Sequence, residues 1–352
     1  MLPRIRTAHR LALLSLVTAC GDDPATEAPR LALAQLQLKG THNSYHKLDA
    51  PPADPALDYY HEPLTTQLDT EAVRHFELDA HLDPDGKTAR VYHIAIIDPG
   101  TQCDTLDDCL RELRTWSDAH PRHLPIVIFL EAKSDLAEIG GCCGPDGDPS
   151  TCDFEGLGER CWDGALDLID TTFETAWPTR LFSPDNIPLT AGASPRSALP
   201  DLDTLRGQLI CVLNDGGSLR DEYRRQQNAR DDLAGRACFV TADPTDADAV
   251  FIKRDDPACN NGAGPGCDIE SLVAAGYLVR TRADTDAVPD PARAARAMAS
   301  GAHFISTDFP ATRPGKDFFF DLPGGVPARC NPVSGTPSDG SRPACEPSLV
   351  SE

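Results

Sequence analysis

The chain has 352 residues and a formal net charge of −23, and 40% of its residues are hydrophobic. A surface this acidic argues against binding to nucleic acid through its phosphates and against electrostatic attachment to anionic lipids. The simplest meaning of the acidity is solubility in an extracellular or salty medium. The length allows one large barrel domain or two smaller domains.

The N-terminus has the pattern of a lipoprotein-type secretory signal. A basic segment, a short apolar run, a small residue and a cysteine follow one another as Arg4, Arg6 and Arg10, then Leu11–Thr18, then Ala19 and Cys20. The apolar run is too short to span a bilayer. We expect residues 1–19 to be removed, Cys20 to be lipidated and residues 20–34 to form a tether. An ordinary cleaved signal that contains a cysteine by chance is the alternative.

A lipidated Cys20 implies an exported bacterial protein held at the outer membrane or the cell surface, with a periplasmic or secreted protein as the alternative. Without Cys20 the 13 cysteines become 12, an even number that suits disulfides in an exported chain. No later stretch is long and apolar enough for a transmembrane helix.

The remaining cysteines bracket short loops. We expect disulfides to staple the loops at Cys103 and Cys109, Cys259 and Cys267, and Cys330 and Cys345, whereas Cys211 and Cys238 form either a pair or two buried thiols. Four more cysteines lie in a Gly/Pro/Asp-rich insertion at 140–164, namely Cys142, Cys143, Cys152 and Cys161. The insertion has no histidine and no paired C-x-x-C spacing, which favours disulfides over zinc.

Strand-like runs in the first part of the chain each lead into polar residues. The runs are 36–38, 73–76, 91–92 and 126–130, and the polar residues are His42 with Asn43, Glu77, His93 and Glu131. Polar groups at the carboxyl ends of successive strands are typical of a (β/α)8 barrel, an α/β fold also called a TIM barrel.

The second half continues the alternation of strands and helices. Strand-length runs at 208–213, 238–241, 250–252, 277–280 and 303–306 alternate with helix-like segments at 219–234, 269–275 and 291–299. The nine candidate strands are one more than a barrel needs, so we expect 238–241 or 250–252 to be accessory. Residues 331–352 lack apolar periodicity and are expected to form a stapled or mobile tail.

Two histidines and four oxygen donors make a candidate catalytic centre. His42 and His93 can supply a general base and a general acid near neutral pH. The oxygen donors are Asn43, Glu77, Asp79 and Glu131. An all-oxygen set suits a hard cation such as Ca²⁺ or Mg²⁺ rather than zinc. Glu77 and Asp79 face the same side of a strand, where a cation would offset the cost of burying them; a surface strand would also explain them.

Three basic residues are candidates for binding the substrate. Lys133 shares the face of Glu131 and can meet a phosphate, although a solvated loop lysine explains it equally well. Arg280 and Arg282 alternate near a strand end and can bind phosphate or hydroxyl groups, or instead form ion pairs with Asp284 or Asp308. Five other histidines are expected to be loop or surface residues: His46, His61, His81, His120 and His123.

As a set, these motifs resemble bacterial calcium-dependent phosphatidylinositol-specific phospholipase C over roughly residues 35–320. The resemblance rests on residues 42–45, Glu77-x-Asp79, Tyr92-His93, Glu131, and the segments 116–125, 278–284 and 300–308. It implies a distorted (β/α)8 barrel as a single catalytic domain at 35–322, followed by a tail at 323–352. It also implies that Asn43, Glu77, Asp79 and Glu131 hold calcium while His42 and His93 flank the phosphate.

The same resemblance implies cleavage of phosphatidylinositol-type phospholipids to diacylglycerol and an inositol cyclic phosphate. The inositol 2-hydroxyl would attack the phosphorus, with His42 as base or as hydrogen-bond donor to the phosphorane and with His93 as acid. We expect a monomer whose partners are a phospholipid or other phosphodiester at a membrane surface, and no nucleic acid.

Three alternatives stay open. A glycerophosphodiester phosphodiesterase or a sphingomyelinase D-like lyase has a similar site, but the phosphodiesterases typically begin with His-Arg-Gly where this chain has His42-Asn43-Ser44. The non-enzymatic alternative is a lipid-anchored binding protein on a decayed barrel.

Overall fold

The computed structural model describes residues 30–82, 87–133, 163–187, 195–226, 232–259, 262–337, 340 and 342–352. The predicted signal, Cys20 and most of the insertion at 140–164, with its four cysteines, lie outside these residues. No helix in the described part of the chain combines the length and the apolar character that a membrane crossing needs.

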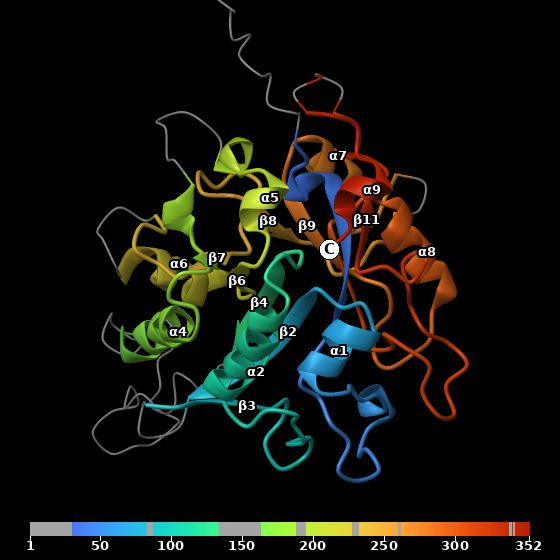
Figure 1. The fold of residues 1–352 in the computed structure, drawn as a ribbon. Helices are drawn as coiled ribbons and strands as arrows, with labels where there is room; N and C mark the ends of the chain where they lie inside the picture. The colour runs from blue at the N-terminus through green and yellow to red at the C-terminus, as the bar shows by residue number, and fades with distance from the viewer. Residues whose placement is uncertain are drawn as a thin grey trace, which may run out of the picture.

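Eight parallel strands form the wall of a barrel, which confirms the predicted fold class (Figure 1). In order around the wall they are β1 (Leu36–Thr41), β2 (His75–Leu82), β4 (Ile126–Ala132), β6 (Leu209–Leu213), β7 (Cys238–Val240), β8 (Phe251–Lys253), β9 (Leu278–Arg282) and β10 (Phe304–Thr307). The wall is distorted where β7 meets β8. There a single bridge joins Thr241 to Phe251, supported by a 2.9 Å hydrogen bond from Ala242 N to Phe251 O.

The extra strand is not the predicted one. Segments 238–241 and 250–252 both contribute wall strands, β7 and β8. The accessory strand is β3 (Ala89–Val91), which runs antiparallel to the end of β2. The run at 91–92 is therefore not a wall strand but lies beside the carboxyl end of β2, at the mouth of the barrel. A short connection between two paired strands allows only an antiparallel return. A two-residue strand, β5 (Leu181–Phe182), pairs with the start of β6.

Helices cover the outside of the wall (Figure 1). They are α1 (Leu64–Thr70), α2 (Leu106–Ala119), α4 (Asp163–Ala176), α5 (Leu202–Leu205), α6 (Gly217–Gln226), α7 (Ile269–Ala274) and α8 (Pro291–Ala299). Local signals explain two of them. Thr105 caps α2 by accepting from Asp108 N, and Asp290 caps α8 by accepting from Arg293 N, with Pro291 at the first helical position. No helix lies in the described connection between β7 and β8.

The interior of the barrel has an apolar floor and a polar upper half. Phe129, Phe239, Phe251 and Phe304 pack inside the wall, with ring centroids 5.3–6.3 Å apart between neighbours. Side chains that point outward from the same strands pack against the helices in a separate cluster. This division follows from the period of two along each strand, which sends successive side chains to opposite faces.

The segments that flank the predicted catalytic domain both pack against the barrel floor. Leu31 and Leu33, within the predicted tether, are buried in the floor cluster. The tail contributes β11 (Ala328–Cys330), antiparallel to β1, and the short helix α9 (Pro347–Val350). Beyond α9, Glu352 Oε1 accepts from Arg74 Nε at 2.6 Å.

Four disulfides are present in the described residues. They join Cys103 to Cys109, Cys211 to Cys238, Cys259 to Cys267, and Cys330 to Cys345. The first, third and fourth staple the predicted loops. The second links the adjacent strands β6 and β7, which resolves the choice between a pair and two thiols.

We predict that Gly40→Ala destabilises the barrel. A Cβ at Gly40 would lie 2.1 Å from the ring of His75, which is fully buried between β1 and β2. Overpacking of this kind costs about 1–3 kcal/mol in the free energy of unfolding, measured by urea denaturation. Gly216→Ala is the control, because its Cβ meets nothing within 4 Å. Equal costs for the two substitutions would contradict the close contact.

Candidate active site

The first predicted catalytic histidine, His42, lies directly after β1 and is held by a carboxylate. Its Nδ1 is 2.8 Å from Asp308 Oδ1, and Asp308 follows the neighbouring strand β10. His42 and Arg282 together hold the pKa of Asp308 far below its usual range despite its burial. Because Nδ1 donates to this carboxylate, Nε2 of the neutral ring is the free, basic nitrogen. The His42 side chain is 20% exposed, so a substrate at the mouth of the barrel can contact it.

The second, His93, is held in the same way by a different turn. Its Nδ1 is 2.8 Å from Asp98 Oδ2, and its side chain is 21% exposed. Burial lowers the pKa of His93, while the hydrogen bond and charge of Asp98 oppose that shift. Positive charge on His42 also lowers the pKa of His93, so the two histidines are close enough to interact electrostatically.

Of the five histidines expected in loops or at the surface, four are buried, and only His120 is exposed. His46 Nε2 lies 2.8 Å from Asp98 Oδ1, so one carboxylate binds both His46 and His93. His61 Nε2 donates to the carbonyl of His42 at 2.8 Å, and burial lowers the pKa of His61 to about 3, which keeps it neutral. His46 therefore contacts the carboxylate that holds His93, and His61 contacts the backbone of His42, the two predicted catalytic histidines.

The predicted metal ligand Glu77 is buried and fully engaged. Its Oε2 accepts from Arg280 Nη2 at 2.5 Å, and its Oε1 accepts from Asn214 Nδ2 at 2.9 Å. Arg280 also reaches Asp255 Oδ1 at 3.2 Å and is only 1% exposed. The guanidinium therefore serves as a buried counter-charge in this structure.

Asp79 lies beside Glu131, because the register of β2 and β4 pairs these two residues. Lys133 Nζ is 2.6 Å from Glu131 Oε1 and 2.8 Å from Asp79 Oδ2. Only the contact to Glu131 has hydrogen-bond geometry, so neither oxygen of Asp79 has a hydrogen-bond partner among the described residues. Burial raises the pKa of Asp79 to about 6, and Lys133 only partly offsets that shift. The negative charge of the buried Asp79 carboxylate is therefore only partly compensated by Lys133.

The fourth predicted ligand, Asn43, follows His42 in the left-handed backbone region, with φ +43°. Its Nδ2 donates to the Tyr59 hydroxyl at 2.9 Å, which fixes the amide and turns its oxygen away from Tyr59. Asparagine is among the few residues that tolerate this conformation.

The donor set fits a hard cation, although it is not arranged as a cage. Within the described ranges, no three His, Cys, Asp or Glu side chains are grouped closely enough to hold a metal ion. Cationic side chains already contact these carboxylates: Lys133 contacts Asp79 and Glu131, and Arg280 contacts Glu77. The unsatisfied, buried Asp79 carboxylate is the feature that a divalent cation would complete.

The three predicted substrate-binding cations occupy different places. Arg282 Nη2 lies 3.1 Å from His42 Nδ1 and 3.2 Å from Asp308, at the mouth. Its ion pair with Asp308 is the alternative that the sequence left open. Arg280 lies below the mouth and forms an ion pair with Glu77, and Lys133 forms ion pairs with Asp79 and Glu131.

Sequence reasoning missed the carboxylates that orient the histidines. Asp308 lies two residues after the strand-like run at 303–306, which is the same kind of signal that identified His42 and Glu131. Asp98 has no such signal, because it lies in a turn after β3. Asp215, after β6, was also missed; it accepts from Ala132 N at 2.8 Å, and burial raises its pKa to about 7.

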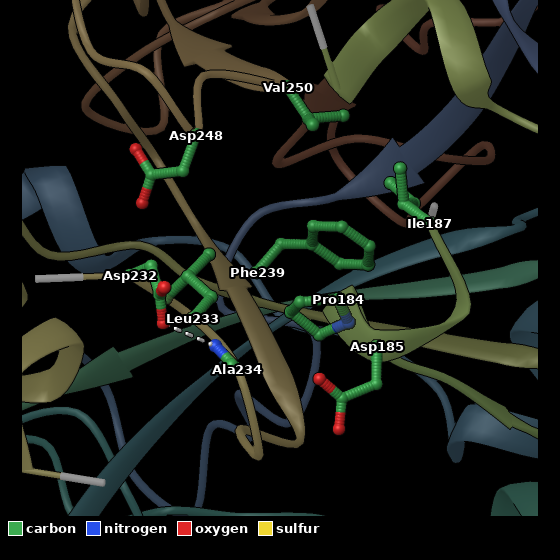
Figure 2. A pocket seen from close by; sticks show the side chains of 9 residues that line it. All are labelled: Pro184, Asp185, Ile187, Asp232, Leu233, Ala234, Phe239, Asp248 and Val250. Atoms are coloured by element: carbon green, nitrogen blue, oxygen red, sulfur yellow. Dashed lines mark hydrogen bonds between the residues drawn. The ribbon is translucent and has the colours of Figure 1, made fainter. Parts of the chain in front are cut away.

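A small apolar pocket elsewhere does not form part of this site. It lies between β7, the start of β8 and the 3-10 helix η4 (Pro184–Asn186), with Phe239 at its centre (Figure 2). Phe239 belongs to the barrel floor. The carboxylates around the pocket have partners: Asp248 pairs with Arg224, and Asp185 accepts from Gly235 N at 3.0 Å.

Comparison with known proteins identifies the family. The family model described as Phosphoinositide phospholipase C, Ca2+-dependent matches residues 31–90 and 87–332, most of the chain. The chain belongs to this family. It is therefore a phosphodiesterase of the calcium-dependent phospholipase C type, and the match favours that activity over the two enzymatic alternatives.

Solved structures agree in fold. The calcium-dependent phosphoinositol-specific phospholipase C from the Gram-negative Pseudomonas sp. is 19% identical, covering 86% of this chain and 96% of that chain at a TM-score of 0.54. The calcium-dependent phosphatidylinositol-specific enzyme from Streptomyces antibioticus is 20% identical, covering 80% and 95% at 0.53. A comparison with curated proteins found no match.

We predict that Arg280→Met destabilises this phospholipase C family member by about 3–5 kcal/mol, because it leaves the buried Glu77 without its counter-charge. Chemical unfolding in chelator measures the loss. Glu77→Gln added to the same chain should recover much of it, since the uncompensated charge is then gone. Arg254→Met is the control, because its partner Asp268 is 43% exposed and such surface pairs contribute about 0–1 kcal/mol. A loss no larger than the control's would contradict this role of Arg280.

Proposed function

We propose that this protein cleaves phosphatidylinositol-type phospholipids, with calcium, to diacylglycerol and an inositol cyclic phosphate. The observation that carries the proposal is the pair of histidines at the barrel mouth. Each is held through Nδ1 by a carboxylate 2.8 Å away, and each remains about one-fifth exposed. A base and an acid held in this way suit an in-line displacement at phosphorus that needs no enzyme nucleophile.

His42 would act on the attacking group. Asp308 accepts the Nδ1 proton and stabilises the imidazolium that forms when Nε2 takes the proton of the inositol 2-hydroxyl. Arg282, beside the same carboxylate, keeps Asp308 ionised and lies where a phosphate oxygen or inositol hydroxyl would arrive. The alternative role of His42, as hydrogen-bond donor to the phosphorane, uses the same Nε2.

His93 would act on the leaving group. An acid must carry a proton before it can give one, and burial lowers the pKa of His93, which disfavours the protonated ring. The charge of Asp98 opposes that effect and orients the ring, so that Nε2–H can protonate the glycerol oxygen of diacylglycerol. Water would then open the cyclic phosphate in a slower second step.

Asn43, Glu77, Asp79 and Glu131 would hold the calcium. When bound, calcium supplies positive charge that stabilises the nonbridging phosphate oxygen and lowers the pKa of the attacking hydroxyl. With calcium held by Asp79 and Glu131, the Lys133 ammonium would be available to the substrate phosphate. Magnesium fits this set less well, because it favours a smaller and more rigid octahedral site.

The lipid anchor at Cys20, export to the outer membrane or cell surface and a monomeric state belong to the same proposal. The four disulfides of the described residues support export, because such bonds persist in oxidising compartments outside the cytosol.

Replacing each catalytic histidine by alanine should give different results on two substrates. Diacylglycerol leaves as an alkoxide of high pKa and needs a proton, whereas a nitrophenolate leaving group does not. His93→Ala should therefore lose ~10²–10⁴-fold in kcat on phosphatidylinositol and far less on a nitrophenyl inositol phosphate. His42→Ala should lose activity on both, because the 2-hydroxyl must be activated in either case.

Equal losses of His93→Ala on the two substrates would refute its role as acid. A reversed pattern would exchange the roles of His42 and His93. Unchanged activity in both variants would move the active site elsewhere.

Asp79→Asn should abolish the calcium response without unfolding the protein. The pKa of Asp79 is about 6 in the fold, against ~3.9 unfolded, so the native state binds more protons between about pH 4 and pH 6. The ionised carboxylate therefore lowers the stability of the metal-free protein above about pH 6, and Asp79→Asn removes that cost. In chelator at pH 7 the variant should be at least as stable as the wild type, and the difference should shrink near pH 4.

Calcium at 100-fold its Kd should add ~2.7 kcal/mol to the wild type and much less to Asp79→Asn. Glu270→Gln, on the exposed face of α7, should respond to calcium as the wild type does. An equal calcium shift in all three proteins would remove Asp79 from the metal site.

A further inference from the structure

A buried carboxylate to which the mechanism assigns no role lies beside the one that holds His42. It is Asp284, which follows β9 and is fully buried. The register of β9 and β10 pairs Arg282 with Ser306, so Asp284 comes beside Asp308 two positions further along both chains. Burying a carboxylate is costly unless its oxygens are engaged, so the groups that bind Asp284 indicate its role.

Both oxygens of Asp284 accept hydrogen bonds from the end of β10. Oδ1 accepts from the backbone N of Asp308 at 2.7 Å, and Oδ2 accepts from Thr307 Oγ1. Thr307 Oγ1 in turn accepts from Phe309 N at 2.9 Å. The side chain of Asp284 therefore anchors the segment 307–309, directly at Asp308 and through the Thr307 hydroxyl.

The segment after β9 also binds the side chain of Asp308. Arg282 Nη2 donates to its two oxygens at 3.2 and 3.3 Å, and Ala287 N donates to Oδ2 at 3.2 Å. Oδ1 lies 2.8 Å from His42 Nδ1. One short segment thus holds Asp308 both at its carboxylate and, through Asp284, at its backbone.

The two neighbouring carboxylates differ in charge. Burial and the charge of Asp308 raise the pKa of Asp284, whereas His42 and Arg282 hold the pKa of Asp308 far below its usual range despite its burial. A proton that enters the pair therefore binds to Asp284, and Asp308 keeps the charge that orients His42. Protonated Asp284 keeps both contacts, because Oδ2–H can donate to Thr307 Oγ1 while Oδ1 accepts from Asp308 N.

Asp284 can influence the reaction only through Asp308. A substrate at the mouth cannot contact Asp284, because its side chain is fully buried. Asp308 sets the tautomer and the orientation of His42, so its own placement matters for the reaction. A shift of about 1 Å in a catalytic group can cost ~10²-fold in rate.

We propose that Asp284 is a positioning residue for the pair of His42 and Asp308. It fixes the backbone of Asp308, so that the carboxylate meets Nδ1 of His42 and Nε2 is directed at the attacking hydroxyl. This inference rests on the proposed function, because it assigns His42 to the attacking group.

Hydrogen exchange at the Asp308 amide, measured by NMR in chelator, tests the contact without turnover. Asp284→Ala removes the acceptor, so the amide should exchange ~5-fold faster or more, as expected for the loss of one hydrogen bond. Asp284→Asn keeps an acceptor at Oδ1, and its amide should exchange nearly as slowly as in the wild type. Asp286→Asn is the matched control, because Asp286 is an exposed carboxylate of the same segment, with a φ of +55° that asparagine tolerates.

Turnover then tests whether the contact serves catalysis. Asp284→Ala should lose up to ~10²-fold in kcat on phosphatidylinositol with KM unchanged, and Asp284→Asn should recover most of that loss. The loss should be the same on a nitrophenyl inositol phosphate, because the 2-hydroxyl must be activated in either substrate. Asp286→Asn should keep wild-type kcat.

A double-mutant cycle distinguishes positioning from a general structural role. In a chain that already carries Asp308→Ala, no carboxylate is left to position, so adding Asp284→Ala should cost less than ~2-fold in kcat. Equal losses in the two backgrounds would overturn the proposal, as would wild-type kcat in Asp284→Ala or no recovery in Asp284→Asn. If the wild type cleaves neither substrate while the Asp308 amide still responds to Asp284→Ala, the proposed function fails and the contact stands.

Discussion

Two carboxylates on one strand, Glu77 and Asp79, lie inside the barrel with side chains only 4% and 1% exposed. Removing such charges from water costs several kcal/mol each unless opposite charges and hydrogen bonds compensate them. Arg280 and Asn214 satisfy Glu77, whereas Lys133 is the one cation that forms an ion pair with Asp79 among the described residues. This unequal compensation is what the rest of the site depends on. It makes the mouth polar above an aromatic floor. It also leaves the buried Asp79 carboxylate with a charge that a divalent cation would compensate.

The barrel produces this arrangement through register alone. Parallel pairing of β2 with β4 sets Asp79 beside Glu131, and the period of two sends Glu77 and Asp79 to the same interior face. Below them lie His75 and the phenylalanine rings, and the missing side chain at Gly40 leaves room for the His75 ring against β1. The turns after β3 and β9 then add what the strands lack. The first brings Asp98 to His93, and the second binds Asp308, which holds His42.

Much of this was predictable because it follows from local pattern. Strand-like runs that end in polar residues identified His42, Glu77 and Glu131, and paired cysteines around short loops identified the disulfides. The partners of the histidines were not predictable in the same way. His42 and Asp308 are separated by 266 positions in sequence, and their contact depends on β1 pairing with β10. The burial of His46 and His61 likewise depends on tertiary packing, to which their local sequence gives no signal.

The direction of β3 shows the same limit. A short apolar run before His93 reads as one more wall strand, since period and length do not distinguish parallel from antiparallel pairing. The structure uses it as a return over the rim, and the count of wall strands is completed by the short β7 and β8 instead. His93 therefore lies at the mouth of the barrel after an antiparallel strand, which its local sequence did not indicate.

The most direct test of the central claim is the product formed from phosphatidylinositol, followed by ³¹P NMR with calcium, with chelator and after calcium is restored. A calcium-dependent phosphodiesterase with this site should convert the lipid phosphodiester signal into that of an inositol cyclic phosphate. Turnover should stop in chelator and return with calcium. Conversion that continues at full rate in chelator, or that occurs only with phosphatidylcholine, sphingomyelin or glycerophosphodiesters, would contradict the claim.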